Sequence, residues 1–148
     1  DGACKQATSE LAYERSGPER FLETYYVLEE LVRVLGPDPD VRGAEGLGRL
    51  VAQLHTLRRM SVSVAGMLHA GKEPVLEAAI VKDVGTIWEQ RLPHRARELA
   101  AFSEPEATNQ IPFDKKLAYA TTIAPKLTIQ GGTTEVLRGI IARGLGLR

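Results

Sequence analysis

Two glycines near the C-terminal end of the chain, with the residues that follow them, form a segment that could contact an anion or a cofactor. Gly131 and Gly132 let the backbone turn sharply and approach a ligand closely. Thr133 then takes the position of a helix N-cap, and Glu135 falls in the first turn, where negative charge suits the helix dipole. A turn of this kind presents free N–H groups to an anion. Helix capping alone also accounts for Thr133 and Glu135.

A glutamate near the other end of the chain is the second candidate for chemistry. Glu14 follows Leu11 by three residues and precedes Pro18 by four, so it falls on an apolar stripe of a predicted helix. We therefore expect its carboxylate to point inward, where loss of solvation makes a carboxylate a stronger base. The alternatives are a solvated position at the end of the stripe, or an ion pair with Arg15 or with a neighbouring helix.

The composition favours no charged partner and no disulfide framework. Basic and acidic residues balance at 19 each, so no net field directs the chain to nucleic acid. Hydrophobic residues make up 43%, yet no apolar run approaches the ~20 residues of a membrane span. Cys4 is the only cysteine, which predicts a reducing, cytoplasmic location. The three histidines, His55, His69 and His94, have no spacing typical of a metal site.

The elements that would position these residues are helices, because apolar residues recur at spacings of three and four along most of the chain. Three long stripes run from Leu11 to Leu35, from Leu47 to Leu68 and from Leu76 to Leu99. A shorter helix is predicted at 114–123, and a final helix begins at Thr133.

Glycine and proline residues separate these helices. The segment 36–40, Gly-Pro-Asp-Pro-Asp, ends the first stripe, and Gly71 ends the second. Pro74 suits the start of the third helix, Pro93 is expected to bend its later part, and Pro125 breaks the fourth. The sequence thus predicts a single all-α domain over residues 1–148, an up-down four-helix bundle whose last helix is split. Stripes of this length also leave apolar surface for a partner domain or subunit.

The two candidate segments resemble the C-terminal helical domain of acyl-CoA dehydrogenases. The first is Leu11-Ala-Tyr-Glu-Arg-Ser-Gly17, and the second is Gln130-Gly-Gly-Thr-Thr-Glu-Val-Leu-Arg138. In the isovaleryl and long-chain branches of that family, the catalytic base is a Glu directly before an Arg in the first helix. Most other branches place the base near the C-terminus as Glu-Gly-Thr, where this chain has Gly131. The resemblance implies that Glu14 is the base.

The same resemblance implies roles for five further residues. Arg15 would lie at the mouth of the acyl-CoA site and hold the C-terminal turn through its backbone, unless it forms an ordinary ion pair. Tyr13 would line the acyl cavity, unless it is plain packing. Gly131 would lie on the substrate side, and Gly132, with Thr133 and Glu135, would contact the adenosine side of FAD.

Two motifs of the family are absent. Relatives follow the first helix with Arg…Phe-Gly, whose arginine reaches the flavin pyrophosphate of a neighbouring subunit, whereas this chain has Val-Leu-Gly-Pro-Asp-Pro-Asp at 34–40. Relatives also carry Gln…Gly-Gly-x-Gly-Tyr before the last helix, and the stretch 111–129 has no such glycines. These absences favour an alternative function, a non-catalytic helical oligomerisation module or the inactive partner of a mixed dehydrogenase.

The resemblance also implies the setting of the domain. We expect a piece of a larger protein, preceded by an N-terminal helical domain and a β-domain, because the chain starts at Asp1-Gly2. The whole enzyme would use FAD to desaturate an acyl-CoA, pass electrons to an external acceptor and assemble as a homo- or hetero-oligomer, while the isolated domain would be inactive. A third possibility is an unrelated helical bundle, which an outward-facing Glu14 would favour.

Overall fold

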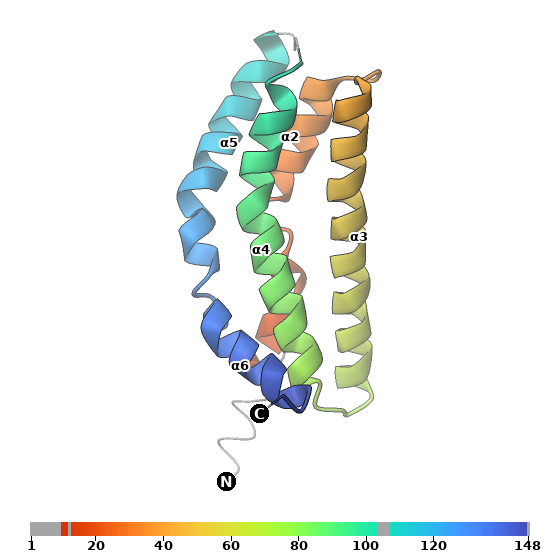
Figure 1. Cartoon of the computed structure of the whole chain (residues 1–148), viewed down its shortest axis with the longest axis vertical. Coiled ribbons are helices and arrows are strands. Elements are labelled where there is room, and N and C mark those ends of the chain that lie inside the picture. Colours follow the sequence, from red (N-terminus) through yellow and green to blue (C-terminus); the bar gives the residue numbers. More distant parts are fainter. Residues whose placement is uncertain (1–9, 12, 104–106, 148) are drawn as a thin grey trace.

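The structure, a computed structural model, describes residues 10–11, 13–103 and 107–147, and within these ranges every regular element is a helix. Figure 1 shows long helices lying side by side in an elongated bundle, so the prediction of an all-α bundle is confirmed. Cys4 lies outside the described residues. No helix in the described part of the chain is both long enough and apolar enough to cross a membrane. The elements are η1 (Pro18–Arg20), α2 (Tyr25–Leu35), α3 (Val41–His69), α4 (Val75–Ala100), α5 (Ala107–Leu127) and α6 (Thr134–Gly144).

The long helix expected from Leu11 to Leu35 is broken, and that prediction was wrong. The described residues between 10 and 16 are helical, but Gly17 is extended with φ −63° and ψ 159°, and regular α-helix resumes only at Tyr25. Pro18 explains the break, because proline lacks an N–H and disfavours a helical conformation in the residue before it. The broken stretch lies close to α4, since a Cβ on Gly85 would stand 2.4 Å from the carbonyl oxygen of Arg20.

The turns on either side of α3 follow the predicted chemistry. Gly36 has φ +71° after α2, a conformation that favours glycine. Asp40 caps α3, because its Oδ1 accepts a hydrogen bond from the Gly43 N–H at 2.6 Å. Gly71, with φ +72°, follows the end of α3, and Pro74 is the N-cap residue of α4.

Helix α5 is longer than the segment 114–123 that the sequence predicts. It includes both Pro112 and Pro125, and α4 likewise continues through Pro93. A proline inside a helix removes one hydrogen bond but keeps a helical φ, so burial of the surrounding side chains can outweigh the loss. Phe113 and Leu127, each 2% exposed, provide that burial in α5.

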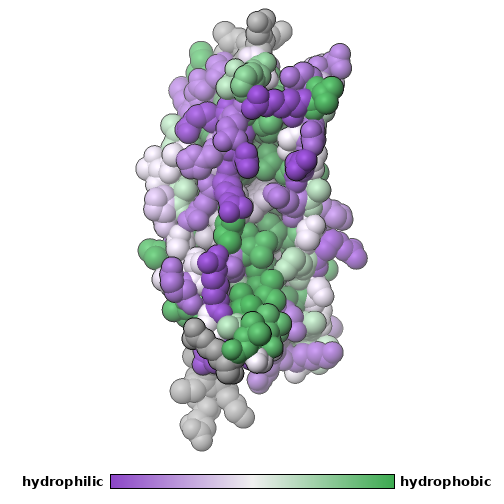
Figure 2. Space-filling view, in the orientation of Figure 1, coloured by the Kyte–Doolittle hydropathy of each residue, from purple (hydrophilic) through white to green (hydrophobic). Residues whose placement is uncertain are grey.

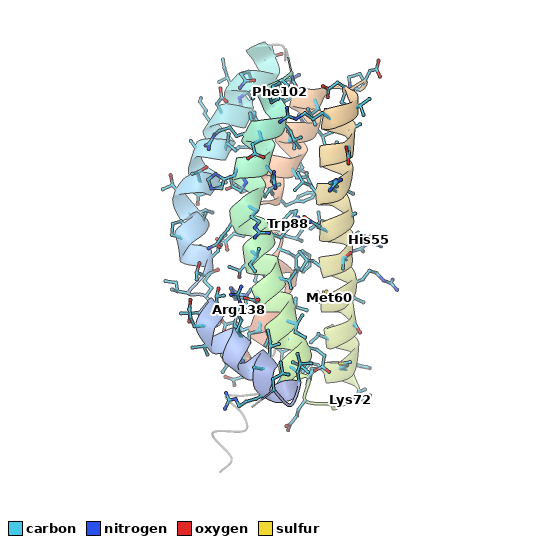
Figure 3. All side chains as sticks on the ribbon, in the orientation of Figure 1. His55, Met60, Lys72, Trp88, Phe102 and Arg138 are labelled. Carbon is cyan, nitrogen blue, oxygen red and sulfur yellow. The ribbon has the colours of Figure 1, made fainter. Side chains whose placement is uncertain are left out.

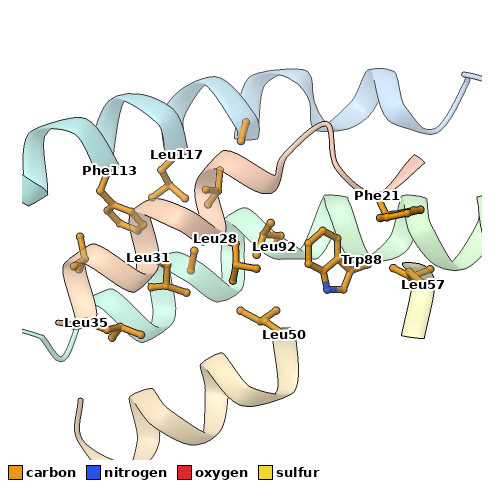
Figure 4. Close-up of a cluster of buried hydrophobic side chains, with 14 residues drawn as sticks. Phe21, Leu28, Leu31, Leu35, Leu50, Leu57, Trp88, Leu92, Phe113 and Leu117 are labelled. Atoms are coloured by element: carbon orange, nitrogen blue, oxygen red, sulfur yellow. The ribbon is translucent and has the colours of Figure 1, made fainter. Parts of the chain in front are cut away.

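Helix α4 is the centre of the bundle and packs against α2, α3, α5, α6 and η1. Figure 4 shows the main hydrophobic core, where side chains from four helices and the η1–α2 turn meet. Its largest members are Phe21, Leu28, Leu31, Leu35, Leu50, Leu57, Trp88, Leu92, Phe113 and Leu117. Burial of these side chains supplies most of the free energy that holds α2 and α5 to α4.

The fourth helix is split into α5 and α6, as predicted. Residues 128–133 form the turn between them, and α6 then packs along the N-terminal half of α4. An ion pair joins α6 to α4, with Arg138 Nε 3.5 Å from Asp83 Oδ2. Figure 3 labels Arg138 on α6.

Candidate functional site

The turn between α5 and α6 depends on its two glycines. Gly131 has φ +68° and Gly132 has φ +116°, and both values lie in the region where L residues with side chains are strained. A Cβ on Gly131 would meet three side chains at ordinary contact distances: Glu14 Oε1 and Arg15 Cγ at 3.5 Å, and Lys82 Cε at 3.6 Å. The structure therefore brings Glu14, Arg15 and Gly131 together, as the family resemblance implied.

Glu14 does not point into an apolar seam, and that expectation was wrong. Its side chain is 45% exposed, and its Oε1 accepts a hydrogen bond from Arg20 Nη2 at 3.3 Å. The seam ends here because the helix breaks at Gly17, and the following residues, Arg15 and Ser16, are buried in its place. Ser61 of α3 holds this segment, since its hydroxyl donates to the Ser16 carbonyl oxygen at 2.6 Å.

Arg15 links the N-terminal segment to the glycine turn. Its Nε donates to the carbonyl oxygen of Gly131 at 2.8 Å, so the expected backbone contact with the C-terminal turn is present. Burial lowers the pKa of the Arg15 guanidinium, and the charge of Glu14 opposes that shift. The residue is 7% exposed, so this hydrogen bond joins the N-terminal segment to the turn in the interior of the domain.

A second arginine, which sequence reasoning missed, contacts both the backbone and the side chain of Glu14. Arg20 is 8% exposed and its Nε donates to the backbone oxygen of Glu14 at 2.7 Å. Its Nη1 donates to Gln130 Oε1 at 3.2 Å, and its Nε also lies 3.8 Å from Glu19 Oε1. The guanidinium thus joins the Glu14 segment to the residue that precedes Gly131.

Lys82 of α4 is a third cation at the turn, and it was also missed. It is 1% exposed, and its Nζ donates to the Leu127 carbonyl oxygen at 2.8 Å and to the Thr86 hydroxyl. Burial and the nearby charge of Arg20 lower the pKa of Lys82 to about 8, while acidic neighbours oppose the shift.

Glu89 lies one turn beyond Thr86 on the same side of α4 and is 2% exposed. Its Oε1 accepts a hydrogen bond from the Thr24 N–H at 3.2 Å, at the end of the broken stretch. Burial raises the pKa of Glu89 to about 7, against the effect of backbone donors and of Lys82. The turn between η1 and α2 is therefore attached to α4 through a buried carboxyl group.

The sequence held a signal for these buried polar groups. Ala78, Lys82, Thr86 and Glu89 recur at spacings of four and three along α4, which places them on one face of the helix. That face packs on the core, so a lysine and a glutamate on it required partners. Arg20 had no comparable signal, because its position depends on the break at Gly17.

The start of α6 is partly exposed. Thr133 is the N-cap residue by its backbone, but its hydroxyl accepts no capping hydrogen bond. Instead, the exposed carboxylate of Glu135 accepts from its own N–H and from the Thr133 hydroxyl, and these bonds lower the pKa of Glu135. The carboxylate places a negative charge at this helix end, where it would repel a phosphate.

The remaining candidates lie on the surface. Tyr13 is 59% exposed, so it is not ordinary core packing. His55, His69 and His94 are all exposed, and Figure 3 labels His55 on α3. Within the described ranges, no group of three His, Cys, Asp or Glu side chains is close enough to hold a metal ion.

A separate hollow of about 720 Å³ lies between α3 and α4. Leu50 and Trp88 line it, but neither Glu14 nor Gly131 does. Two of its arginines already have partners, since Arg49 pairs with Glu45 at 2.6 Å and Arg95 pairs with Glu98 at 2.8 Å. Because its lining includes neither Glu14 nor Gly131, the hollow is distinct from the Glu14 site.

A known protein family matches most of the chain. The family described as "Acyl-CoA dehydrogenase, C-terminal domain" matches residues 29–146, which extend from within α2 to just beyond α6. The match includes the glycine turn and Lys82 but begins after Glu14, Arg15 and Arg20. No curated protein and no solved structure matches the chain.

Proposed function

Because the chain belongs to the acyl-CoA dehydrogenase family, as a C-terminal domain, we propose that it forms part of an FAD-dependent enzyme that desaturates an acyl-CoA. In this proposal Glu14 is the base that removes the α-proton. The observation that carries it is the position of Glu14, whose Oε1 lies 3.5 Å from where a Cβ on Gly131 would stand. A carboxylate from either position could therefore reach the same space.

The surroundings of Glu14 suit proton abstraction. Its side chain is 45% exposed, so a substrate can approach it, and the Arg20 guanidinium holds one of its carboxylate oxygens. The proton on the α-carbon, next to the thioester, would pass to the carboxylate as the α,β double bond forms. FAD, when bound, supplies the acceptor for the hydride that leaves the β-carbon.

Neighbouring residues would position the two ligands. Arg15 holds the Gly131 carbonyl at 2.8 Å and so keeps the turn open toward Glu14. Tyr13, exposed beside Glu14 in sequence, would contact the acyl-CoA. Gly132, Thr133 and Glu135 would contact the adenosine side of FAD, where the start of α6 is accessible.

The proposal includes a larger assembly. An N-terminal helical domain and a β-domain would complete the flavin and substrate sites, the enzyme would be an oligomer in the cytoplasm, and an external acceptor would reoxidise FAD. On this basis the isolated domain would have no activity.

Replacement of Glu14 tests the proposal. In the full-length enzyme, Glu14→Gln should lower turnover at least ~10²-fold, because the amide keeps the shape but cannot accept the proton. Substrate binding should persist. The matched control is Glu29→Gln, an exposed glutamate of α2, which should turn over like the parent. Parent-like turnover by Glu14→Gln would mean that Glu14 is not the base.

Moving the carboxylate makes the test more specific. The double variant Glu14→Gly with Gly131→Glu should recover part of the lost turnover, since only ordinary contacts surround the Cβ position. Recovery should be incomplete, because φ +68° at residue 131 costs an L residue about 1–2 kcal/mol. If the double variant is no faster than Glu14→Gly alone, the two positions do not serve one reaction site.

A specific observation favours the second candidate function, a non-catalytic oligomerisation module or inactive partner subunit. Figure 2 shows an apolar area on the face that carries α4 and α6, and Val84 and Val136 are 42% and 54% exposed. Exposed apolar patches mark interaction surfaces. Full turnover by the enzyme expressed without a second dehydrogenase chain would exclude this function, whereas activity only on co-expression would support it.

A further inference from the structure

Arg20 contacts Glu14 at two points with one planar group. Its Nε donates to the backbone oxygen of Glu14 at 2.7 Å, and its Nη2 donates to Glu14 Oε1 at 3.3 Å. That same Oε1 is the atom that lies 3.5 Å from the Cβ position of Gly131. The guanidinium therefore holds the oxygen that faces the glycine turn.

The third donor of Arg20 reaches the other side of the site. Nη1 donates to Gln130 Oε1 at 3.2 Å, next to Gly131 in the chain. A guanidinium offers donors in a fixed plane, so the three contacts together set both the distance and the direction between Glu14 and Gln130. A lysine ammonium would keep the charge but could not reproduce this planar set of contacts.

The surroundings of Arg20 make this arrangement rigid. Its side chain is 9% exposed, and its carbonyl oxygen lies against α4, where only Gly85 leaves room for it. Arg20 belongs to η1, which directly follows the break at Gly17. The break therefore has a consequence for the site, because it turns Arg20 back toward the helical turn that carries Glu14.

We propose that Arg20 is a positioning residue for the reaction, which holds the Glu14 carboxylate toward the space beside Gly131. This inference rests on the proposed function, because it gives Arg20 a role only through Glu14. Arg20 itself does not act on the substrate. Its contribution is to orientation of the base, and a small misplacement of a catalytic group can reduce turnover strongly.

Substitutions of Arg20 in the full-length enzyme provide the first measurement. Arg20→Gln should lower kcat about 10- to 100-fold and leave KM within about twofold, because the base loses its orientation while the substrate site remains. Arg20→Lys should fall between Arg20→Gln and the parent. The matched control is Arg58→Gln, an exposed arginine of α3, which should have the parent's kcat.

A double-mutant cycle separates positioning from a purely structural role. Glu14→Asp keeps a base but withdraws the carboxylate from Arg20 by one methylene. If Arg20 acts through the Glu14 side chain, adding Arg20→Gln to Glu14→Asp should change kcat by less than about twofold. A structural role would give the full loss again in the Glu14→Asp background, since the bonds to the backbone oxygen and to Gln130 remain there.

Each result decides one of the two proposals. An unchanged kcat for Arg20→Gln, or independent losses in the cycle, would overturn the positioning role and leave Glu14 as the base. Parent-like turnover by Glu14→Gln would instead overturn the proposed function. If Arg20→Gln does not fold, Arg20→Lys, which keeps the buried charge, replaces it in the same cycle with the same criteria.

Discussion

Apolar packing, with the ion pair of Glu30 and Lys116 beside it, holds the part of the bundle near the α2–α3 turn, whereas hydrogen bonds from buried cations hold the α5–α6 turn. In the first region, Leu31, Leu92 and Phe113 come from three helices and are each at most 2% exposed. In the second, Arg15 and Lys82 donate hydrogen bonds to the carbonyl oxygens of Gly131 and Leu127. Apolar packing is non-directional, while hydrogen bonds fix orientation. The polar region is therefore the better support for a site that needs fixed geometry.

Truncation of a core side chain should give the largest effect and break the apolar region alone. Phe113→Ala should lower the free energy of unfolding by about 3–5 kcal/mol, because the ring is 2% exposed and leaves a cavity. Urea denaturation measures this change. The matched control is Phe102→Ala, since Phe102 is 63% exposed and contacts Arg42 on the surface, and it should cost less than about 1 kcal/mol.

The two regions should also separate in the kinetics of these variants. The folded fraction of Phe113→Ala should keep the parent's kcat, because Phe113 supports no contact to Glu14. A kcat loss as large as that of Arg20→Gln would mean that the core and the polar region are not independent.

The pH dependence of stability should come from the polar region. The pKa of Glu89 is raised from 4.5 to about 7, so the folded state binds more protons than the unfolded state between these values. Stability should therefore fall as the pH rises from 4.5 to 7. The pKa of Lys82 is lowered from 10.5 to about 8, so the unfolded state binds more protons between pH 8 and 10.5. Stability should rise over that range, which leaves a minimum near pH 7–8.

Each slope can be removed separately. Across its pH range, each slope changes the free energy of unfolding by up to about 3 kcal/mol. Glu89→Gln should abolish the fall on the acid side, and Lys82→Met should abolish the rise on the alkaline side. Denaturation of both variants and of the parent at pH 5, 7.5 and 10 measures this. Retention of both slopes in both variants would show that other groups control the pH dependence.

Substitution of a turn glycine should have the smallest effect and sharpen the comparison. Gly132→Ala should cost about 1–2 kcal/mol, because φ +116° strains an L residue although the Cβ has room, 3.7 Å from Arg15 Nη2. The control is Gly139→Ala within α6, where a Cβ meets nothing within 4 Å and should stabilise the helix by up to about 1 kcal/mol. Equal effects of the two variants would show that the turn carries no backbone strain.

The sequence was sufficient for elements whose signals are local. Gly36 and Gly71 mark the C-terminal ends of α2 and α3, because turn preferences depend on the adjacent backbone. The break at Gly17 was missed, since the apolar spacing continues through Pro18 and hides it. Helix α5 was placed too short, because burial of Phe113 and Leu127 outweighs the prolines, and burial is a tertiary property.

The candidate site divides in the same way. Glu14 was a candidate from its place on an apolar stripe and Gly131 from the double glycine, but their roles came from resemblance to a family, and their proximity could not be read from periodicity. Arg20 was missed because its contacts with Glu14 and Gln130 depend on the break at Gly17. Lys82 was missed although its spacing along α4 carried a signal, and its main-chain partner, the Leu127 oxygen, leaves no pattern in side-chain types. The prediction that Glu14 points inward was wrong because it assumed a helix that continues past Gly17.

The bond from Arg15 Nε to the Gly131 carbonyl oxygen joins residues that are 116 positions apart in the chain. Closing so long a loop has an entropic cost that local helical contacts do not share. We therefore expect α2 to α5 to associate before this bond forms and the surroundings of Glu14 to assemble last. We expect the reverse order on heating. Opening of α6 alone separates the two ends of the chain while most of the bundle persists, so thermal inactivation should precede the loss of helix content.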